Sequence, residues 1–373
     1  MIEASFSAPA RTFVYVSAAT AGTIDIYSMD ETTGALTQVS TFDAGKMVMP
    51  MTISPDRKHL YAVIRAQPYR VLTLAIEPAT GKLTQEAIAA LPDSMAYVST
   101  DPSGGLLFAA SYGGSKIAVL PIGKDGLVTD GARQMILTGR NAHSIVSDRT
   151  GKYVFATNLG SDVVLQFVIN PETGMLEAND PLQVATRPGY GPRHIILSPD
   201  NKSVYVLTEL TGHVIHYALD PTRGTLSEVE SVSSVPEDAG LYPGIAPLAP
   251  PPFNAATPAA APTDDGKPKV WAADLDITPN GKFLYTTERT TSKIALFHVA
   301  GGNGQLTYVT NYPTEQQPRG IRLDPSGRFL TASGEKSDKL SVYAIDQENG
   351  ALALVGRYPV DAGANWIESM TLP

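Results

Sequence analysis

A repeated turn-and-strand unit dominates the sequence and limits the folds that the chain can adopt. Six segments combine a polar turn with an apolar run rich in Val, Leu, Tyr and Phe, and they begin at Ser54, Asp101, Asp148, Ser198, Thr278 and Asp324. The run RTFVYVSAA from Arg11 is a seventh copy. Short apolar runs between Gly, Pro, Asp and Asn clusters are typical of β-strands, and helical periodicity is almost absent. The sequence therefore predicts an all-β fold.

A second series of turns sets the length of the repeat. Each copy is followed by another apolar run and a turn that ends in glycine, and these glycines are Gly34, Gly81, Gly126, Gly174, Gly224, Gly304 and Gly350. Their successive spacings are 47, 45, 48, 50, 80 and 46 residues. A period of roughly 40–50 residues with four strand-like runs is typical of β-propeller blades. The sequence thus predicts a seven-bladed β-propeller with four-stranded antiparallel blades.

The ends of the chain and the long spacing complete this interpretation. The final run NWIESMTLP, from Asn365, resembles an innermost strand, whereas the run from Arg11 resembles a second strand. Pairing the two would close the ring and remove unpaired strand edges. The spacing of 80 residues contains a Pro/Ala-rich loop insertion at about 236–269. Residues 1–373 are expected to form a single propeller domain that carries this loop.

Composition narrows the range of partners. The chain has 28 Lys and Arg against 37 Asp and Glu, a net charge of −9, and no cysteine. Disulfides, thiolate metal sites and a cysteine nucleophile are therefore excluded. An acidic balance without a Lys/Arg run argues against nucleic acid and against an anionic membrane as partners. The N-terminal segment lacks a signal-peptide pattern, and a cytoplasmic location is expected.

Antiparallel strand order predicts which face of the propeller carries a site. The loops between blades and the loops between second and third strands share one face, so variable polar residues there should meet around the central channel. The candidates at the starts of innermost strands are His143, Arg193, His194, Asp274 and Arg319. Those at the ends of second strands are Arg65, Tyr112, Asn158, Glu209, Glu288, Arg289 and Glu335. Histidines, arginines and carboxylates are thus predicted to ring one channel mouth.

Structural roles are the alternative for these residues. His143 and His194 could be core histidines, the arginines could pair with glutamates to join adjacent blades, and Tyr112 could serve only in packing. No GxSxG, HExxH, P-loop or GxGxxG motif occurs. His143, Asp274 and Glu209 could supply metal ligands, but no local spacing demands a metal, so neither a metal nor a cofactor is expected.

Four segments resemble a known family. They are NAHSIV from Asn141, GYGPRHIILSPD from Gly189, VWAADLDITPNGKFLYTTERT from Val270 and PTEQQPRGIRLDPSGRFL from Pro313. These segments look like the seven-bladed β-propeller lactonases, a family that includes bacterial 6-phosphogluconolactonase and fungal 3-carboxy-cis,cis-muconate cyclase. The resemblance extends over essentially the whole chain and is closest to the bacterial 6-phosphogluconolactonase branch.

The resemblance implies a function and assigns roles to four residues. It implies hydrolysis of a sugar δ-lactone, foremost 6-phosphoglucono-1,5-lactone in the oxidative pentose phosphate route, with a small anionic sugar lactone as the partner. His143, Arg193, Glu209 and Arg289 correspond to the family's site. His143 is expected to be the general base and Glu209 its orienter or an alternative base, while the two arginines stabilise the oxyanion or clamp an anionic group. The other eight candidates are expected to bind substrate.

Other functions remain open at this level. One is a lactonase for an unphosphorylated aldaric or uronic acid lactone, and another is a lactonising cyclase of the muconate type. A third, of a different class, is a non-catalytic propeller that presents a face to another protein. The third alternative predicts a large exposed apolar patch and no converging Arg/His cluster.

Overall fold

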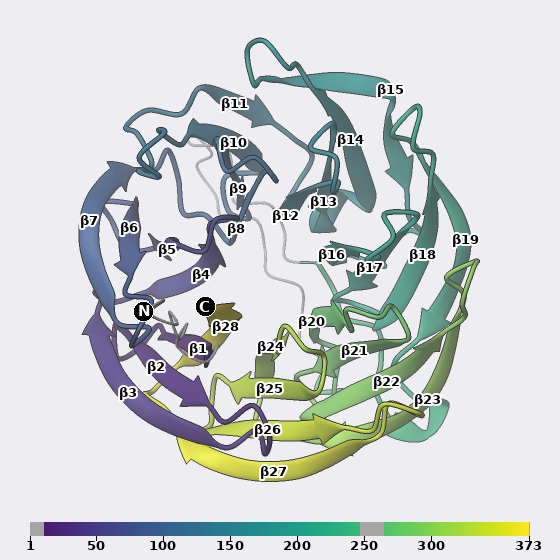
Figure 1. The fold of residues 1–373 in the computed structure, drawn as a ribbon. Helices are drawn as coiled ribbons and strands as arrows, with labels where there is room; N and C mark the ends of the chain where they lie inside the picture. The colour runs from purple at the N-terminus through teal and green to yellow at the C-terminus, as the bar shows by residue number, and fades with distance from the viewer. Residues whose placement is uncertain (1–10, 247–264, 373) are drawn as a thin grey trace, which may run out of the picture.

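The computed structural model describes residues 11–246 and 265–372, in which 28 strands form seven four-stranded sheets. The sheets are arranged around a central axis with the first strand of each nearest the axis (Figure 1). This arrangement confirms the predicted all-β fold with seven antiparallel blades. In the same residues, no helix is long and apolar enough to cross a membrane.

The blades share one internal order, from the innermost to the outermost strand. They are β28 (Ala364–Leu372), β1 (Arg11–Ala18), β2 (Thr23–Met29) and β3 (Leu36–Asp43); β4 (Val48–Ile53), β5 (His59–Ile64), β6 (Arg70–Ile76) and β7 (Leu83–Ala90); β8 (Tyr97–Thr100), β9 (Leu106–Ser111), β10 (Lys116–Pro121) and β11 (Gln134–Leu137); β12 (Ala142–Ser147), β13 (Tyr153–Asn158), β14 (Val163–Ile169) and β15 (Leu176–Ala185); β16 (Pro192–Leu197), β17 (Ser203–Thr208), β18 (His213–Leu219) and β19 (Leu226–Ser233); β20 (Ala272–Ile277), β21 (Phe283–Glu288), β22 (Lys293–Val299) and β23 (Leu306–Pro313); β24 (Pro318–Leu323), β25 (Phe329–Gly334), β26 (Lys339–Ile345) and β27 (Leu352–Pro359). Two short 3₁₀ helices are η1 (Leu159–Ser161) and η2 (Glu237–Ala239).

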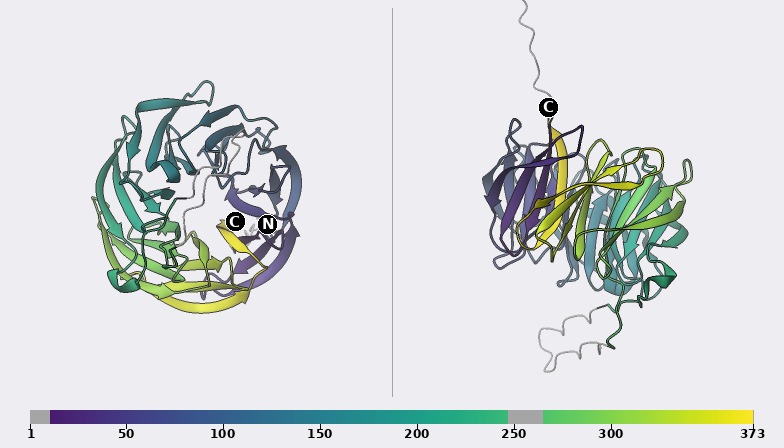
Figure 2. Two further views of the ribbon diagram at one scale, coloured as in Figure 1. Left: turned by 180° about the vertical axis from the view of Figure 1, so that it is seen from behind. Right: turned by 90° about the horizontal axis from the view of Figure 1, so that it is seen from below.

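The two ends of the chain close the ring within one blade. Strand β28 pairs antiparallel with β1, from Arg11 opposite Leu372 to Ala18 opposite Ala364. In Figure 2 the yellow β28 lies beside the purple strands of the N-terminal region. Ring closure by the C-terminal innermost strand is therefore confirmed.

The repeated glycines mark a contact between neighbouring blades. Gly81 has φ 69° and its carbonyl accepts a hydrogen bond from the Tyr15 hydroxyl of the preceding blade at 3.0 Å. A Cβ at Gly81 would lie 2.4 Å from the Phe13 ring, which is closer than packing allows. Gly350 has the same relation to Phe283 and Tyr285. The period of the sequence thus follows from the docking of each hairpin turn onto the blade before it.

The predicted loop insertion lies between β19 and β20. Residues 247–264 of it lie outside the described residues, and the two flanking segments are joined at their base. The amide of Tyr242 donates to the carbonyl of Pro268 at 2.9 Å, and the amide of Val270 donates to the carbonyl of Tyr242 at 2.8 Å. The base of the insertion therefore leads directly into Trp271 and strand β20.

Ring closure makes one buried side chain of β28 a sensitive test of stability. Ile367 is 1% exposed and belongs to an apolar cluster with Val14 and Leu340. Ile367→Ala is expected to lower the free energy of unfolding by about 2–5 kcal/mol, because it leaves a cavity where the ring closes. Urea unfolding followed by circular dichroism measures this change.

Leu354→Ala is the matched control for this prediction. Leu354 lies on the outermost strand β27 and is 55% exposed, so its truncation should change the free energy by no more than about 0.5 kcal/mol. Equal losses in the two variants would contradict a closure that depends on packing of β28.

Candidate active site

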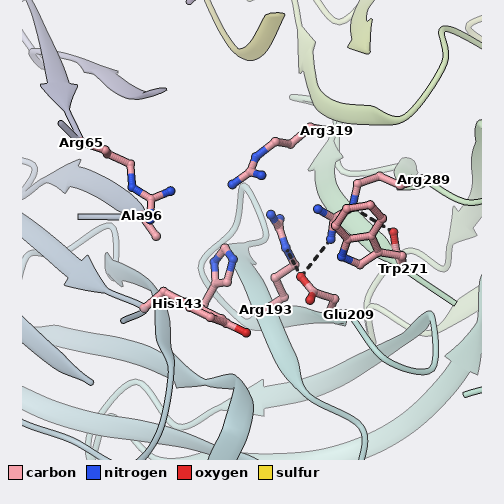
Figure 3. A pocket seen from close by; sticks show the side chains of 9 residues that line it. Arg65, Ala96, His143, Arg193, Glu209, Trp271, Arg289 and Arg319 are labelled. Carbon is pink, nitrogen blue, oxygen red and sulfur yellow. Dashed lines mark hydrogen bonds and ion pairs between the residues drawn. The ribbon is translucent and has the colours of Figure 1, made fainter. Parts of the chain in front are cut away.

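A cavity of about 250 Å³ opens at one mouth of the central channel. Polar side chains from several blades converge on it (Figure 3). Its lining consists of Arg65, Ala96, Tyr112, His143, Arg193, Glu209, Trp271, Arg289 and Arg319. The structure thus brings together seven of the twelve predicted site residues, including all four that the family resemblance singles out. This volume lies below the usual range of about 300–1,000 Å³ for ligand pockets, which favours one small ligand.

Glu209 joins two arginines on one side of the cavity. Its Oε2 atom accepts hydrogen bonds from Arg193 Nε at 2.8 Å and from Arg289 Nη2 at 2.9 Å. Arg193 also donates to the carbonyl of Ala273, and Arg289 Nε donates to the carbonyl of Trp271 at 3.1 Å. Charge-assisted bonds of this kind hold both guanidinium groups in place before any ligand binds.

The same bonds keep Glu209 ionised. Burial opposes ionisation, but the charges of Arg289 and Arg193 outweigh it and hold the pKa of the Glu209 carboxyl below its ordinary value. Burial, together with the charge of Arg193, lowers the pKa of Arg289 to about 9. Glu209 is consequently a poor proton acceptor at neutral pH, and its geometry suits an orienting role better than that of a base.

Two further arginines face the cavity from other blades. Arg319 Nη1 donates to Glu335 Oε1 at 3.0 Å, and Arg65 Nε donates to Ser94 Oγ at 3.0 Å. Burial and the charge of Arg319 lower the pKa of Arg65 to about 10. Glu209 and Glu335 offset only two of the four guanidinium charges, which leaves a formal charge of +2. Such a cavity attracts an anionic ligand.

His143 lies on β12 between this charge cluster and the interior of the channel. It is 5% exposed, and its ring contacts Tyr112 and His194 edge-on, with ring centroids 5.6 and 5.2 Å away. Burial, followed by the charge of Arg193, lowers the pKa of His143 well below 6.5. The imidazole is therefore neutral at pH 7, and one nitrogen can accept a proton.

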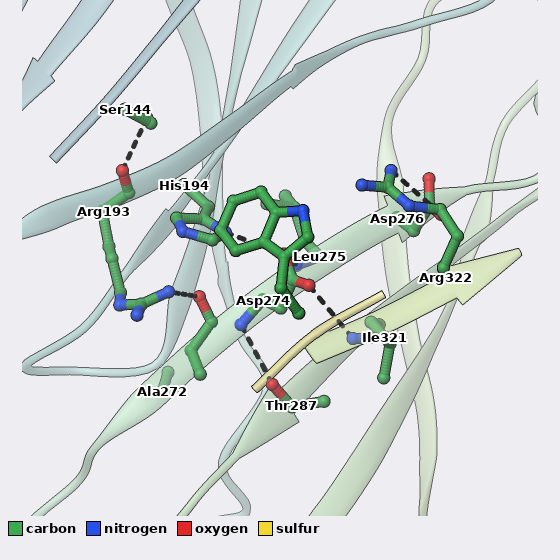
Figure 4. Close-up of polar contacts among 12 residues, drawn as sticks. Ser144, Arg193, His194, Ala272, Asp274, Leu275, Asp276, Thr287, Ile321 and Arg322 are labelled. Carbon is green, nitrogen blue, oxygen red and sulfur yellow. Dashed lines mark hydrogen bonds and ion pairs between the residues drawn. The ribbon is translucent and has the colours of Figure 1, made fainter. Parts of the chain in front are cut away.

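Five predicted binding residues do not line the cavity. Glu335 reaches it only through Arg319. His194 and Asp274 pair with each other at 2.7 Å deeper in the channel (Figure 4). Asn158 Nδ2 donates to Thr138 Oγ1 at 2.9 Å. Glu288 accepts hydrogen bonds from the amides of Trp271 and Thr290, at 2.9 and 3.0 Å.

Side-chain alternation explains the placement of Asn158 and Glu288. The cavity residues Arg65, Tyr112, Glu209 and Arg289 each follow the last residue of a second strand. Asn158 and Glu288 are themselves the last residues of β13 and β21. Because successive side chains of a strand point to opposite sides, one step along the chain turns them away from the cavity.

Two lining residues escape prediction from the sequence. Ala96 has no chemical signature. Trp271 is 37% exposed and stacks on the guanidinium of Arg289, whose Cζ lies 3.7 Å from the ring centroid. Its place in the WAAD segment, directly after the insertion, was the available signal. Within residues 11–246 and 265–372, no three His, Asp or Glu side chains are grouped so that they could hold a metal ion.

Comparison with known proteins identifies the class to which this fold and cavity belong. Residues 13–368 match the family model "Lactonase, 7-bladed beta-propeller", and the chain belongs to this family. It is 36% identical over 312 residues to the 6-phosphogluconolactonase of Pectobacterium carotovorum, covering 83% of this chain and 84% of the relative. The 6-phosphogluconolactonase of Serratia proteamaculans is also 36% identical, over 84% of this chain and 85% of its own length.

A solved structure adds a similar fold. The periplasmic gluconolactonase of Pseudomonas aeruginosa superposes with a TM-score of 0.81 at 25% identity, over 98% of this chain and 100% of that chain. The family resemblance inferred from the four sequence segments is thus confirmed, and with it the expectation of an enzyme of the lactonase class.

The bridge formed by Glu209 predicts a stability that depends on pH. Glu209→Gln removes a buried negative charge between two arginines and should lower the free energy of unfolding at pH 7 by about 3–5 kcal/mol. Because the folded-state pKa is depressed, the wild-type advantage is fully present above the unfolded pKa of about 4.3 and is lost as pH falls through the folded value. Urea unfolding of both proteins at pH 7, 5 and 3.5 measures it. An advantage that persists undiminished at pH 3.5 would contradict this account.

Proposed function

We propose that the chain hydrolyses 6-phosphoglucono-1,5-lactone to 6-phosphogluconate. The observation that carries this proposal is the excess positive charge of a small cavity in which a neutral histidine faces four arginines. A phosphorylated sugar lactone supplies both features that the cavity complements, a compact carbonyl ester and an anionic tail. The names of the relatives from Pectobacterium and Serratia support the same substrate.

The positions of the arginines suggest how the substrate is oriented. Glu209 fixes Arg193 and Arg289 beside His143, so these two are proposed to stabilise the oxyanion that develops on the lactone carbonyl. Arg65 lies across the cavity from them, Arg319 extends into the space between (Figure 3), and both are proposed to hold the phosphate. The cavity-facing ring of Trp271 offers an apolar wall for the sugar.

His143 is proposed to act as the general base. A water molecule attacks the lactone carbonyl while His143 takes one of its protons, and the same proton later passes to the ring oxygen as its bond to carbon breaks. Binding of the phosphate offsets the arginine charges that depress the pKa of His143, so its proton affinity rises when substrate is present. Glu209 orients the arginines throughout this sequence.

Replacement of Arg193 tests this arrangement. Arg193→Ala should lower kcat/KM for freshly prepared 6-phosphoglucono-1,5-lactone at least about tenfold, or 1.4 kcal/mol of transition-state stabilisation. The assay follows acid release and subtracts spontaneous hydrolysis. Arg149→Ala is the control, because Arg149 is exposed and binds Ser198 at the opposite channel mouth. Wild-type turnover in folded Arg193→Ala would remove Arg193 from the mechanism.

Replacement of Arg319 tests whether this residue binds the phosphate group of the substrate. Arg319→Ala should raise KM for the phosphorylated lactone at least about tenfold and leave KM for glucono-1,5-lactone within about twofold, since only the former carries the anion. An unphosphorylated lactone is the second candidate substrate, favoured by the similarity to the Pseudomonas gluconolactonase. Faster wild-type turnover of glucono-1,5-lactone than of the phosphorylated lactone would favour that candidate.

Burial of His143 and the positive charge around it predict that its pKa is low in the ligand-free protein. In the ligand-free protein, His143 should remain neutral as pH falls through 6.5, because burial and the charges of Arg193, His194, Arg319 and Arg289 disfavour the imidazolium. Saturating 6-phosphogluconate, the proposed product, should raise the pKa of His143, because its negative charge offsets that of the arginines. NMR titration of ¹⁵N-histidine measures both states. A ligand-free His143 that titrates at 6.5 or above would contradict the electrostatic description of the cavity.

A further inference from the structure

Two buried nitrogen atoms, one in the ring of His143 and one in the ring of His194, have no hydrogen-bond partner among the described residues. Within the described residues, neither His143 Nδ1 nor His194 Nε2 has a hydrogen-bond partner, although both are inaccessible to solvent. Buried polar atoms are nearly always hydrogen-bonded, so two such atoms on neighbouring rings require an explanation. The ring centroids lie 5.2 Å apart with the planes at 63°. This separation is short enough for a rotation of either ring to bring the two nitrogens to hydrogen-bond distance, about 3 Å.

Asp274 determines which nitrogen of His194 carries a proton. Its Oδ1 atom lies 2.7 Å from His194 Nδ1, and its Oδ2 atom accepts the amide of Ile321 at 3.0 Å (Figure 4). Burial opposes ionisation of Asp274, but His194 and other donors outweigh it and keep its pKa below the ordinary value. An ionised carboxylate only accepts hydrogen bonds, so His194 Nδ1 must be the donor.

His194 then presents an acceptor to its neighbour. Burial, followed by the charge of Arg193, lowers the pKa of His194 to about 4, so the ring is neutral at pH 7. A neutral imidazole with its proton on Nδ1 has a lone pair on Nε2. That lone pair can be satisfied by one buried donor nearby, an N–H at Nδ1 of His143.

We propose that Asp274 and His194 are positioning residues that hold His143 in the tautomer with its proton on Nδ1 and its unprotonated Nε2 directed into the cavity. His143 lines the cavity and Nδ1 is its buried nitrogen, so Nε2 is the atom that can meet a ligand. The opposite tautomer would place a proton where the mechanism needs an acceptor. The tautomer is a property of the chain alone, whereas its catalytic consequence rests on the proposed function.

The proposed reaction moves one proton to and from His143 Nε2, and no proton passes from His143 to His194 or Asp274. His143 Nε2 takes the proton of the attacking water as the new carbon–oxygen bond forms, and it returns that proton to the ring oxygen as the old bond breaks. Meanwhile Nδ1–H of His143 donates to His194 Nε2, and Nδ1–H of His194 donates to Asp274. The resulting imidazolium is stabilised by this pair of hydrogen bonds, the second of which ends on the Asp274 carboxylate.

The charged and titratable groups around the two rings come from several blades. Arg193, Arg289 and Arg319 surround His143, and the Tyr112 ring contacts it. Tyr97 and Trp366 contact the ring of His194, at centroid distances of 5.2 and 5.7 Å. Arg322 lies near Asp274 and favours its ionised form.

NMR of ¹⁵N-histidine-labelled protein at pH 7, without lactone, tests the proposal directly. Long-range ¹H–¹⁵N correlations distinguish the two neutral tautomers, and the chain has six histidines, so His143→Gln and His194→Gln assign the two resonance sets. Both rings of the wild-type protein are expected to carry the proton on Nδ1. A wild-type His143 with its proton on Nε2 would overturn the proposal.

Asp274→Asn should reverse both tautomers. The amide oxygen can still accept the Ile321 amide, while the amide nitrogen donates to His194 Nδ1 and moves the proton of His194 to Nε2. His143 must then accept at Nδ1 and carry its proton on Nε2. We expect kcat for the lactone to fall at least about tenfold, with KM within about twofold. An unchanged His143 tautomer in the folded variant would overturn the proposal.

Asp276→Asn is the matched control. Asp276 lies two residues further along β20, and its Oδ2 atom accepts the amide of Leu323 at 2.9 Å in the same way, but its ionic partner is Arg322. This variant should leave both tautomers and kcat unchanged. If both wild-type rings carry Nδ1–H and Asp274→Asn reverses them, yet no lactone is hydrolysed, the positioning is supported and only the proposed function fails.

Discussion

Pairing of β28 with β1 determines where every other side chain of the channel lies. Eight residue pairs, with one bulge between Ser17 and Ala18, join the two ends of the chain inside a single blade. A row of blades without this pairing would leave two apolar edges exposed, and its innermost strands would share no axis. Because the ring closes, residues separated by up to some 250 positions face one cavity. The site is therefore a consequence of closure rather than of any local motif.

Closure also permits an arrangement of charge that a flexible chain would not maintain. Four arginines around one small cavity repel each other, and burial together with this repulsion lowers the pKa values of Arg65 and Arg289. Strand pairing holds their backbones in place, and Glu209 offsets part of the repulsion. The remaining field is available to an anionic ligand, whose binding relieves it. Stability and affinity are coupled here, since the charge that opposes folding favours binding.

The architecture could be predicted from the sequence because each repeat contains a turn that contacts the preceding blade. The glycine spacing reflects turns that must approach the preceding blade closely, as at Gly81 against Phe13. The cavity residues were found because variable polar positions stood out against this regular background. Asn158 and Glu288 lie one step of side-chain alternation away from the cavity-lining positions, and this step depends on the residue at which a strand ends. Sequence patterns locate such an end only to within a few residues.

Side-chain contacts between particular residues of different blades could not be predicted from the sequence. Nothing in the separate segments GPRH and WAAD indicates that His194 and Asp274 meet, because 80 residues and the insertion separate them. Their meeting depends on the twist and spacing of adjacent blades. The same holds for Trp271, which follows the base of the insertion and whose ring covers the guanidinium of Arg289.

The interior of the channel differs in charge from the cavity at its mouth. Below His194, Arg322 pairs with Glu368 at 3.0 Å and lies 3.8 Å from Asp276, and Trp366 Nε1 donates to Glu368 at 2.9 Å. One guanidinium there meets two carboxylates, so that layer has no excess positive charge for an anion. The layer at the cavity has the opposite balance, with four guanidinium groups against two carboxylates. His143 lies between the two layers, with one side toward the arginine-lined cavity and the other toward His194. This position gives a single imidazole both access to ligand and a buried partner that can set its tautomer.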